Sequence, residues 1–321
     1  MNQPAIARPM VLVTLALPPT AMNWLRQKFE VLVKTGAPAL DPAMDSLTPA
    51  EAQSVRAVVS NGSIGLTRAQ MARLPQLEIV CAFGAGHENI DAAAARERGI
   101  VVAHAPGAND ATVADHALGL MLALARGFIA LDAAMRRGEW AQARVERPTL
   151  HGSRLGIIGL GRIGAAIAAR GEAFGMQVAY AARTVRTGVP WQHIPAVEAL
   201  ARESDFLVAA CPGGAATRHL VNAAVLAALG KDGYFINIAR GGVVDTAALA
   251  HALHHGIIAG AGLDVYENEP AISPALLAAP HTVFTPHVAG RSPASMAAQS
   301  RMLADNLAAH FDGRTPPHLV H

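Results

Sequence analysis

Short apolar runs alternate with helix-like segments along most of this chain. Runs such as MVLVTLAL, LEIVCAF and IVVAHA lie in the first hundred residues, and a second set that includes SRLGIIGL, DFLVAAC and GYFINIA follows residue 150. Continuous apolar runs are typical of parallel strands that are buried on both faces, with helices as the crossovers between them. The pattern therefore predicts an α/β protein with two doubly wound parallel sheets.

Composition excludes several classes of protein. The 321 residues are 52% hydrophobic and 16% charged with a formal net charge of +2, and like charges do not cluster, so no nucleic-acid partner is expected. The sequence has 2 cysteines, which excludes a disulfide scaffold and fits a reducing compartment. The longest apolar stretch, Ala117 to Ala125, is too short to span a bilayer. We expect a cytoplasmic protein without a membrane partner.

A glycine-rich turn follows the first apolar run of the second set. The segment GLGRIG comes directly after LGII and opens a helix-like run of small residues. In a dinucleotide-binding turn the first glycine allows the sharp bend, the second admits the pyrophosphate and the third permits close helix packing. The alternative is a tight turn without a ligand. The strand before the turn and the helix after it favour a dinucleotide bound by Gly159, Leu160, Gly161, Arg162, Ile163 and Gly164.

The next strand ends without the acidic residue that usually binds the ribose diol. Ala182, Arg183 and Thr184 stand there instead. Alanine accepts no hydrogen bond from a ribose, whereas an arginine can form charge-assisted bonds to a 2′-phosphate. The sequence therefore predicts NADP (NADPH) as the cofactor, with NAD at lower affinity. The alternative is that Arg183 is a solvated loop residue and that either cofactor serves.

The domain boundaries follow from two long helix-like segments. One is expected over Asp110–Arg137, and its apolar stripe suggests a domain seam or a dimer interface. The other follows the last strand and is expected to return to the first domain. We therefore predict a Rossmann nucleotide-binding domain over residues 104–289, inserted in a flavodoxin-like domain over residues 1–103 and 290–321.

The chain resembles the D-isomer-specific 2-hydroxyacid dehydrogenase family over residues 55 to 311. Five segments carry the resemblance, in order and spacing: INIARGGVVD, GLDVYENEP, VFTPHVAG, CAFGAGHENID and NDATVADHALGLML. The resemblance implies NADPH-dependent reduction of a small 2-oxo acid, with glyoxylate and hydroxypyruvate as leading candidates, to the D-2-hydroxy acid. It makes Arg240, Glu269 and His287 the catalytic set. The chemistry agrees, since an imidazole can donate the proton, a carboxylate can orient it and a guanidinium can bind a carboxylate.

The same resemblance assigns further residues. The backbone N–H groups of Ala85 and Gly86 are expected to hold the substrate carboxylate, with Asn61–Gly62 as an opposite wall. Asp264 is expected to accept a hydrogen bond from the nicotinamide carboxamide. The remaining cofactor contacts implied are Thr112, Cys211, Pro212, Ile238, Ala239 and Gly290. Cys211 has no neighbouring base in the sequence, so we interpret its thiol as a packing group.

Other interpretations remain open at this stage. A reductase of bulkier aryl or branched 2-oxo acids would carry the same motifs, and a dinucleotide-sensing regulatory protein could share the scaffold. His251 and His255 lie at i, i+4 spacing, but no carboxylate ligand accompanies them, so no metal is expected. The family resemblance and the apolar helix suggest a homodimer.

Overall fold

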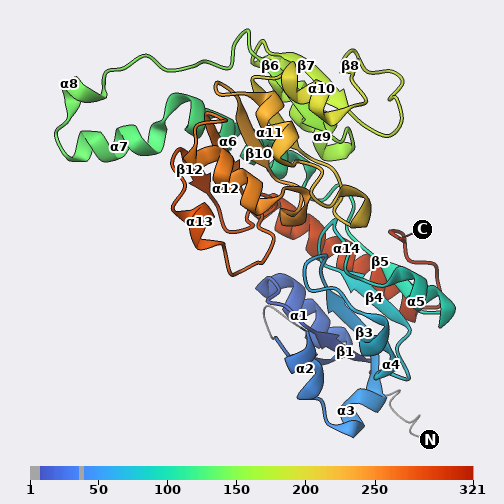
Figure 1. Cartoon of the computed structure of the whole chain (residues 1–321). Coiled ribbons are helices and arrows are strands. Elements are labelled where there is room, and N and C mark those ends of the chain that lie inside the picture. The colour runs from blue at the N-terminus through green and yellow to red at the C-terminus, as the bar shows by residue number, and fades with distance from the viewer. Residues whose placement is uncertain (1–7, 36–39, 321) are drawn as a thin grey trace, which may run out of the picture. The chain divides into compact units, whose positions relative to one another are not determined.

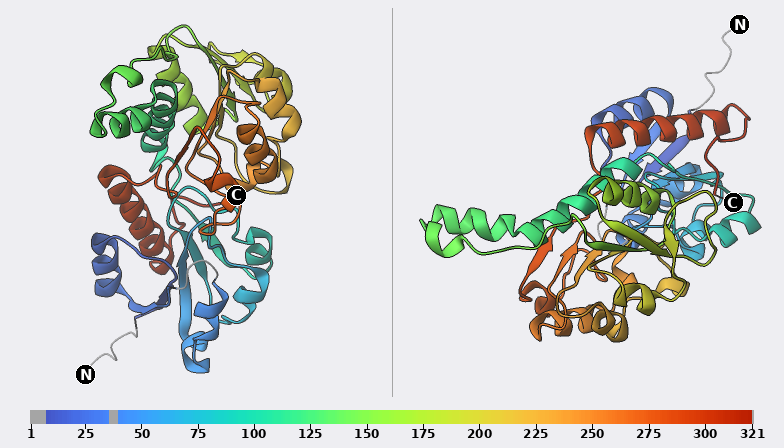
Figure 2. Two further views of the ribbon diagram at one scale, coloured as in Figure 1. Left: turned by 60° about the vertical axis from the view of Figure 1, so that its left-hand side comes forward. Right: turned by 90° about the horizontal axis from the view of Figure 1, so that it is seen from above.

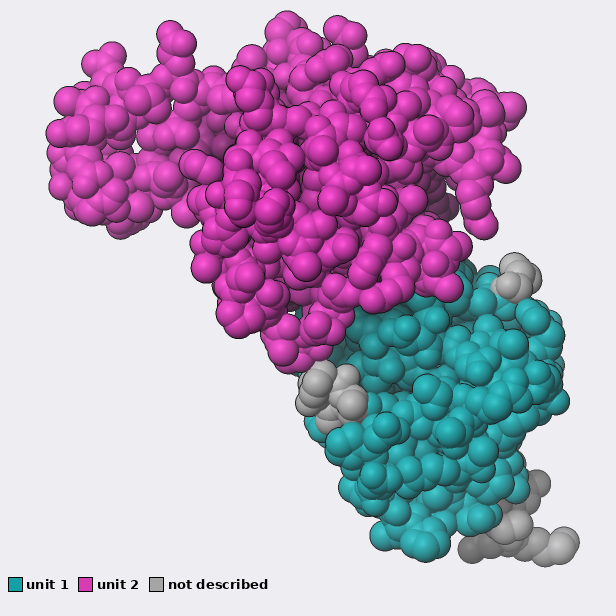
Figure 3. All heavy atoms as spheres, in the orientation of Figure 1, with its two compact units in different colours: residues 1–109, 291–321 teal, residues 110–290 magenta. Residues whose placement is uncertain are grey.

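The computed structural model describes residues 8–35 and 40–320, and the chain divides into two compact units (Figure 3). Unit 1 comprises Met1–Asn109 and Arg291–His321, and unit 2 comprises Asp110–Gly290. The first division falls at Asn109, later than the predicted boundary after residue 103. The segment after residue 103 stays with unit 1 because the N–H of Ala105 donates to the carbonyl of Gly84 at 2.8 Å.

Unit 1 is built on a sheet of five strands in the order β2-β1-β3-β4-β5 (Figure 1). Each neighbouring pair is parallel. This order is that of flavodoxin-like folds, so the predicted class of this domain is confirmed. The strands are β1 Met10–Val13, β2 Glu30–Val33, β3 Val55–Ser60, β4 Ile79–Ala82 and β5 Val101–Ala103.

Helices cover both faces of the unit 1 sheet (Figure 2). Val11 and Val13 of β1 pack with Leu303 and Leu307 of the last helix, whereas Leu12 packs on the other face with the short helices. This alternation within one strand explains why the strands are continuous apolar runs. The helices are α1 Pro19–Lys28, α2 Asp41–Asp45, α3 Pro49–Ser54, α4 Arg68–Ala72, α5 Ala92–Glu97 and α14 Pro293–Phe311.

Unit 2 is built on a sheet of seven strands in the order β12-β11-β10-β9-β6-β7-β8. All neighbouring pairs are parallel, and the order is the Rossmann order extended by one strand beyond the sixth. The strands are β6 Arg154–Ile158, β7 Gln177–Ala181, β8 Gln192–His193, β9 Phe206–Ala209, β10 Tyr234–Asn237, β11 Gly260–Leu263 and β12 Thr282–Phe284. The sequence analysis missed β8, because a strand of two polar residues leaves no apolar run.

The helices of unit 2 also form two layers. The helices α6 and α9 pack on one face of the sheet against Ile157 and Phe206, and α10 to α13 pack on the other against Leu207 and Phe235. The helices are α6 Asp110–Arg126, α7 Phe128–Arg136, α8 Trp140–Ala143, α9 Arg162–Ala173, α10 Val197–Arg202, α11 Ala223–Leu229, α12 Thr246–His254 and α13 Pro274–Leu277, with 3-10 turns η1 Ala215–Thr217 and η2 Gly241–Val243.

The helix predicted over Asp110–Arg137 is two helices. Gly127, with φ +64°, ends α6, and α7 continues at an angle of 54° to it. The predicted apolar stripe of α6 is buried inside unit 2, so it is not a free face for a partner. Several exposed large apolar side chains lie instead on α7 and α8, which project from the rest of unit 2 (Figures 1 and 2), and others, such as Val185, lie elsewhere.

Among the helices of residues 8–35 and 40–320, none is by itself long and apolar enough to cross a membrane; α6 and α7 reach that length only when joined across their bend.

Candidate active site

The predicted residues of unit 2 gather at one edge of its sheet. The glycine turn follows β6, Ala182 to Thr184 follow β7, and Cys211 and Pro212 follow β9. Ile238 to Arg240, Asp264 to Glu269 and Thr285 to His287 follow β10, β11 and β12. Because all of these strands are parallel, their carboxyl ends meet at the same edge, which is where open α/β sheets bind ligands. Thr112 lies in the first turn of α6, and Gly290 is the last residue of unit 2.

The three glycines of the turn have different surroundings. Gly159 has φ +95°, and a Cβ there would lie 2.7 Å from the Cα of Cys211. A Cβ on Gly164 would lie 2.1 Å from the carbonyl oxygen of Gly159. A Cβ on Gly161 would meet nothing within 4 Å, and no side chain caps the α9 helix that begins after it. The turn therefore leaves space and helix N–H groups at Gly161, as a bound pyrophosphate requires.

Two arginines follow β7 in this half of the sheet. Arg186 donates from Nε to the carbonyl of Leu160 at 3.0 Å, and its backbone N–H donates to the Tyr180 hydroxyl at 2.8 Å. Arg186 therefore connects the loop after β7 to the glycine turn. Arg183 and Thr184 are exposed, and the carbonyl of Ala182 accepts a hydrogen bond from Nε2 of His193 at 3.0 Å. No carboxylate stands at the end of β7, and this edge fits a nucleotide whose ribose carries a phosphate.

Four further residues predicted to contact the cofactor are buried or form hydrogen bonds within unit 2. Burial raises the pKa of the Cys211 thiol to about 11, so the group is a neutral thiol, as expected for a packing residue. The carbonyl of Pro212 accepts a hydrogen bond from Thr217. Ile238 and Ala239 are buried, and the Ala239 N–H donates to Asn237 at 3.0 Å.

The residues Glu269 and His287 form a direct pair. Nδ1 of His287 donates to Oε2 of Glu269 at 2.8 Å, and the Tyr266 N–H donates to Oε1 at 3.0 Å. Burial opposes the charged form of this carboxyl, but the His287 and Tyr266 contacts outweigh it and hold the pKa of Glu269 below its usual range. The positive charge of Arg240 acts in the same direction, so Arg240 lies within electrostatic reach of the pair.

The segment that carries His287 is fastened by Asp264. His287 has φ +52°, a left-handed conformation that is strained for a non-glycine residue, and its N–H donates to the Asp264 carbonyl at 2.8 Å. The Asp264 carboxylate, 1% exposed, accepts the N–H groups of Val288 and Ala289, each at 2.9 Å. Asp264 therefore holds the backbone on both sides of His287. Its predicted bond to a nicotinamide carboxamide stays a prediction.

A side-chain relay that the sequence analysis missed supports Asp264. The Thr285 hydroxyl donates to Oδ1 of Asp264 at 2.6 Å and accepts from Nε2 of His116 at 2.9 Å. His116 lies on α6, 169 residues away from Thr285 in the chain. No periodicity or motif links residues at that separation, so only the tertiary structure could reveal the relay.

A second contact of this kind joins two loops of the candidate site. The N–H of His219 donates to the Gly242 carbonyl at 2.8 Å, and its Nε2 donates to Glu267 at 2.9 Å. Arg218 lies 3.1 Å from the same carboxylate. The hydrogen bond from His219 is the largest cause that lowers the pKa of Glu267. The loop after β9 thus connects the loop that carries Arg240 to the loop that carries Glu269.

In unit 1 the predicted carboxylate-binding loop follows β4. Ala85 and Gly86 are half-buried, and a Cβ on Gly62 would lie 2.7 Å from the carbonyl carbon of Gly86. The Asn61–Gly62 turn after β3 therefore lies directly against this loop, and its role as an opposite wall of the substrate site stays a prediction. The Asn61 side chain accepts the N–H groups of Ser63 and Ile64, which shapes the turn.

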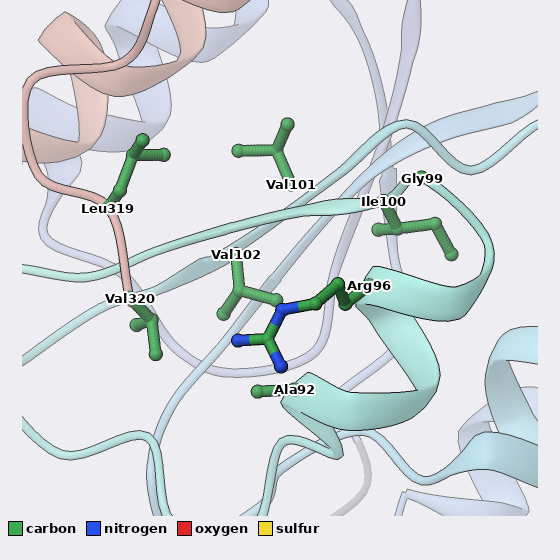
Figure 4. A pocket seen from close by; sticks show the side chains of 8 residues that line it. All are labelled: Ala92, Arg96, Gly99, Ile100, Val101, Val102, Leu319 and Val320. Carbon is green, nitrogen blue, oxygen red and sulfur yellow. The ribbon is translucent and has the colours of Figure 1, made fainter.

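Two further features lie outside the predicted site. A cavity of about 240 Å³ between α5, β5 and the C-terminal segment is apolar except for Arg96 (Figure 4). It contains none of the predicted site residues. His251 and His255 stack with ring centroids 4.0 Å apart, and Nδ1 of His255 bonds to the His251 carbonyl. Within residues 8–35 and 40–320 no group of three or more His, Cys, Asp or Glu side chains could hold a metal ion.

Comparison with known proteins agrees with this geometry. The profile of the D-isomer specific 2-hydroxyacid dehydrogenase, NAD binding domain, matches residues 118–289. A glyoxylate/hydroxypyruvate reductase A of Arabidopsis thaliana is 41% identical over 275 residues, which is 85% of this chain and 88% of the relative. A hydroxyphenylpyruvate reductase of Plectranthus scutellarioides is 37% identical over 91% of this chain and 94% of the relative.

A solved structure is similar over nearly the whole chain. It is an NADPH-dependent glyoxylate/hydroxypyruvate reductase from Sinorhizobium meliloti, in complex with NADP and malonate. Its TM-score is 0.89 at 38% identity, over 98% of this chain and 97% of that chain.

The two parallel sheets, the glycine turn and the His287–Glu269 pair define a nicotinamide-dependent oxidoreductase. The chain belongs to the D-isomer-specific 2-hydroxyacid dehydrogenase family.

Proposed function

We propose that this protein uses NADPH to reduce a small 2-oxo acid to the D-2-hydroxy acid, with glyoxylate and hydroxypyruvate as preferred substrates. The hydrogen bond between His287 and Glu269, with the charge of Arg240 nearby, is the observation that carries the proposal. Similarity to the Arabidopsis and Sinorhizobium glyoxylate/hydroxypyruvate reductases supports this choice of substrate.

The residues of unit 2 take distinct roles in this proposal. A nicotinamide held at this edge of the sheet would supply the hydride. Because Nδ1 of His287 donates to Glu269, its Nε2 is the atom that can donate a proton to the substrate oxygen. Glu269 orients the imidazole through this hydrogen bond. Arg240 binds the substrate carboxylate through its planar guanidinium.

The proposed cofactor is NADPH rather than NADH. Arg183 and Thr184 are exposed at the end of β7, where a 2′-phosphate would lie. Arg186 is already directed to the glycine turn by its bond to Leu160 and adds positive charge beside it. The solved relative with bound NADP supports this choice.

We assign residues 110–290 as the NADP-binding domain and residues 1–109 with 291–321 as the substrate-binding domain. In the latter, the N–H groups of Ala85 and Gly86 are proposed to bind a substrate carboxylate. The exposed apolar side chains on α7 and α8 support a homodimer formed through these helices. Cys81 and Cys211 are free thiols, in keeping with work in the cytoplasm.

The deciding experiment measures initial rates with NADPH and NADH against glyoxylate, hydroxypyruvate and phenylpyruvate. Turnover with NADPH and the two small acids is expected. The His287→Ala variant should lose at least ~100-fold in kcat while still binding NADPH, because general acid catalysis supplies ~100- to 10,000-fold. Tight binding of NADPH without oxidation by any 2-oxo acid would instead favour a dinucleotide-sensing protein.

A second candidate has support from two relatives. The hydroxyphenylpyruvate reductase above acts on an aryl 2-oxo acid by its name, and a 2-ketogluconate reductase of Gluconobacter oxydans is 40% identical over 82% of this chain. Relatives of equal similarity thus differ in the size of the substrate. A kcat/KM for phenylpyruvate or 2-ketogluconate above that for glyoxylate would establish the bulkier class.

A further inference from the structure

A histidine of unit 1 holds the carbonyl group of the predicted carboxylate-binding loop. Nδ1 of His104 lies 2.9 Å from the carbonyl oxygen of Ala85. A carbonyl oxygen only accepts hydrogen bonds, so Nδ1 of His104 carries the hydrogen. The imidazole of His87 packs edge-on against His104 with centroids 5.0 Å apart, and its own Nδ1 is 3.5 Å from the same oxygen. The contact from His104 is therefore the stronger of the two.

This hydrogen bond has a consequence for the next N–H group. A trans peptide is planar, with its carbonyl and N–H pointing in opposite directions. The described residues contain one cis peptide, Glu269–Pro270, so the peptide between Ala85 and Gly86 is trans. Holding the Ala85 carbonyl against His104 therefore directs the Gly86 N–H away from the imidazole.

His104 is itself fixed by the C-terminal part of unit 1. Its N–H donates to the His318 carbonyl at 3.0 Å, and its carbonyl accepts from Asn306 on α14 at 3.1 Å. Asn306 is 1% exposed and also accepts the N–H of His318 at 3.2 Å. The Ala105 N–H also donates to the Gly84 carbonyl at 2.8 Å, which joins the segment that carries His104 to the loop that carries Ala85. These hydrogen bonds fix the backbone that carries the His104 imidazole.

We propose that His104 is a positioning residue, whose bond to the Ala85 carbonyl sets the direction in which the Gly86 N–H binds a substrate carboxylate. This inference rests on the proposed function, which assigns that carboxylate to Ala85 and Gly86. The Asn61–Gly62 turn also lies close to Gly86, since a Cβ on Gly62 would be 2.7 Å from the Gly86 carbonyl carbon.

The imidazole acts here as a neutral donor. Burial lowers the pKa of His104 from its usual value, and the hydrogen bond to Ala85 only partly offsets this. The nearby His87 and His318 lower the pKa further, whereas the charge of Glu88 raises it. At neutral pH His104 therefore orients the peptide without adding positive charge to the loop.

The test compares His104→Leu, which lacks the donor, with His104→Asn, whose side-chain N–H lies at a similar distance from the backbone. We expect the leucine variant to raise KM for glyoxylate about 10-fold, the effect of one lost hydrogen bond. Its kcat at saturating substrate and its Kd for NADPH should stay unchanged. The asparagine variant should recover most of the loss. His310→Leu is the matched control, since it removes a histidine that bonds Glu78 elsewhere in unit 1.

Calorimetric binding of oxamate to the NADPH-loaded protein separates this inference from the proposed function. If the wild type binds oxamate but turns over no 2-oxo acid, the function fails and the variants still test the role of His104. An unchanged KM and oxamate affinity in His104→Leu, or a lower Tm alone, would overturn the inference, as would an asparagine variant no better than leucine. If the leucine variant does not fold, His104→Gln replaces it in the test. The glutamine amide lies one bond further from the backbone, so its N–H donor is displaced from the Ala85 carbonyl.

Discussion

Two arginines that follow β7 stand in different environments. Arg186 donates a hydrogen bond to the Leu160 carbonyl, so its side chain already helps to hold the glycine turn. Arg183 is exposed and close to the strand end, where the ribose of a dinucleotide lies in Rossmann folds. The discrimination between NADPH and NADH is therefore expected to depend chiefly on Arg183.

The Arg183→Ala variant should raise KM for NADPH by roughly 10- to 100-fold, since a hydrogen bond to a charged group contributes ~1.5–3 kcal/mol. KM for NADH should change little, because that cofactor has no 2′-phosphate. Steady-state kinetics with both cofactors measure the difference. Arg202→Ala, which removes an exposed arginine paired with Glu198 on α10, should leave both values unchanged. Equal effects of Arg183→Ala on the two cofactors would exclude the phosphate contact.

Glu269 determines how the activity depends on pH. Its lowered pKa means that the carboxylate stays charged, and its pairing with His287 stays formed, until the pH falls below the ordinary range for a glutamate. The amide of Glu269→Gln does not titrate, so the loss of kcat/KM at low pH that protonation of Glu269 causes should be absent from the pH profile of this variant. The amide oxygen can still accept the Tyr266 N–H, which preserves the local structure. An acidic limb that is the same in the variant as in the wild type would contradict this role.

At the scale of elements, the segment after β12 is held in place by side chains rather than by regular structure. Residues 285 to 289 carry His287 in a left-handed conformation, whose cost is of the order of 1–3 kcal/mol. The bonds from this segment to Asp264, and the relay from His116 through Thr285, offset that cost. These hydrogen bonds therefore hold the loop that carries the His287 imidazole.

Thr285→Val tests this fastening. The variant removes the hydroxyl between His116 and Asp264, so the free energy of unfolding should fall by about 1–3 kcal/mol, the cost of leaving buried polar groups without a partner. kcat should fall as well, because the loop that bears His287 loosens. Urea unfolding and steady-state rates measure the two effects. Thr282→Val is the control on the preceding strand β12, since its hydroxyl donates to the Ala279 carbonyl, away from Asp264, and it should leave kcat unchanged.

At the scale of the whole molecule, several of the exposed large apolar side chains lie on α7, on α8 and just after them. Phe128, Ile129, Trp140 and Val145 are between 54% and 61% exposed. Soluble chains rarely expose several large apolar groups on one projecting segment unless a partner covers them. A second copy of this chain is the proposed partner.

The Ile129→Glu variant should convert the proposed dimer to a monomer, because it would place an unpaired charge in the proposed apolar interface. Light scattering coupled to size-exclusion chromatography measures the mass. Leu277→Glu is the matched control, since Leu277 is 52% exposed on α13, away from these helices, and should leave the dimer intact. A wild-type protein that runs as a monomer would refute the proposal directly.

Sequence alone was sufficient for the fold class, the glycine turn and the placement of Arg240, Glu269 and His287 after strands of one sheet. The physical reason is that buried parallel strands require continuous apolar runs, and that the residues after such strands meet at one edge of the sheet. The break at Gly127 was not predictable in the same way, because the apolar period continues through it and a single glycine can be accommodated in a helix.

Only the tertiary structure decided how these residues are held. Asp264 reaches the backbone of Val288 and Ala289, His116 reaches Thr285, and His104 reaches Ala85. Each of these contacts joins segments that are distant in the chain, and a polar side chain leaves no periodic signal that names its partner. Local patterning depends on neighbours in sequence, whereas the orientation of a functional group depends on neighbours in space.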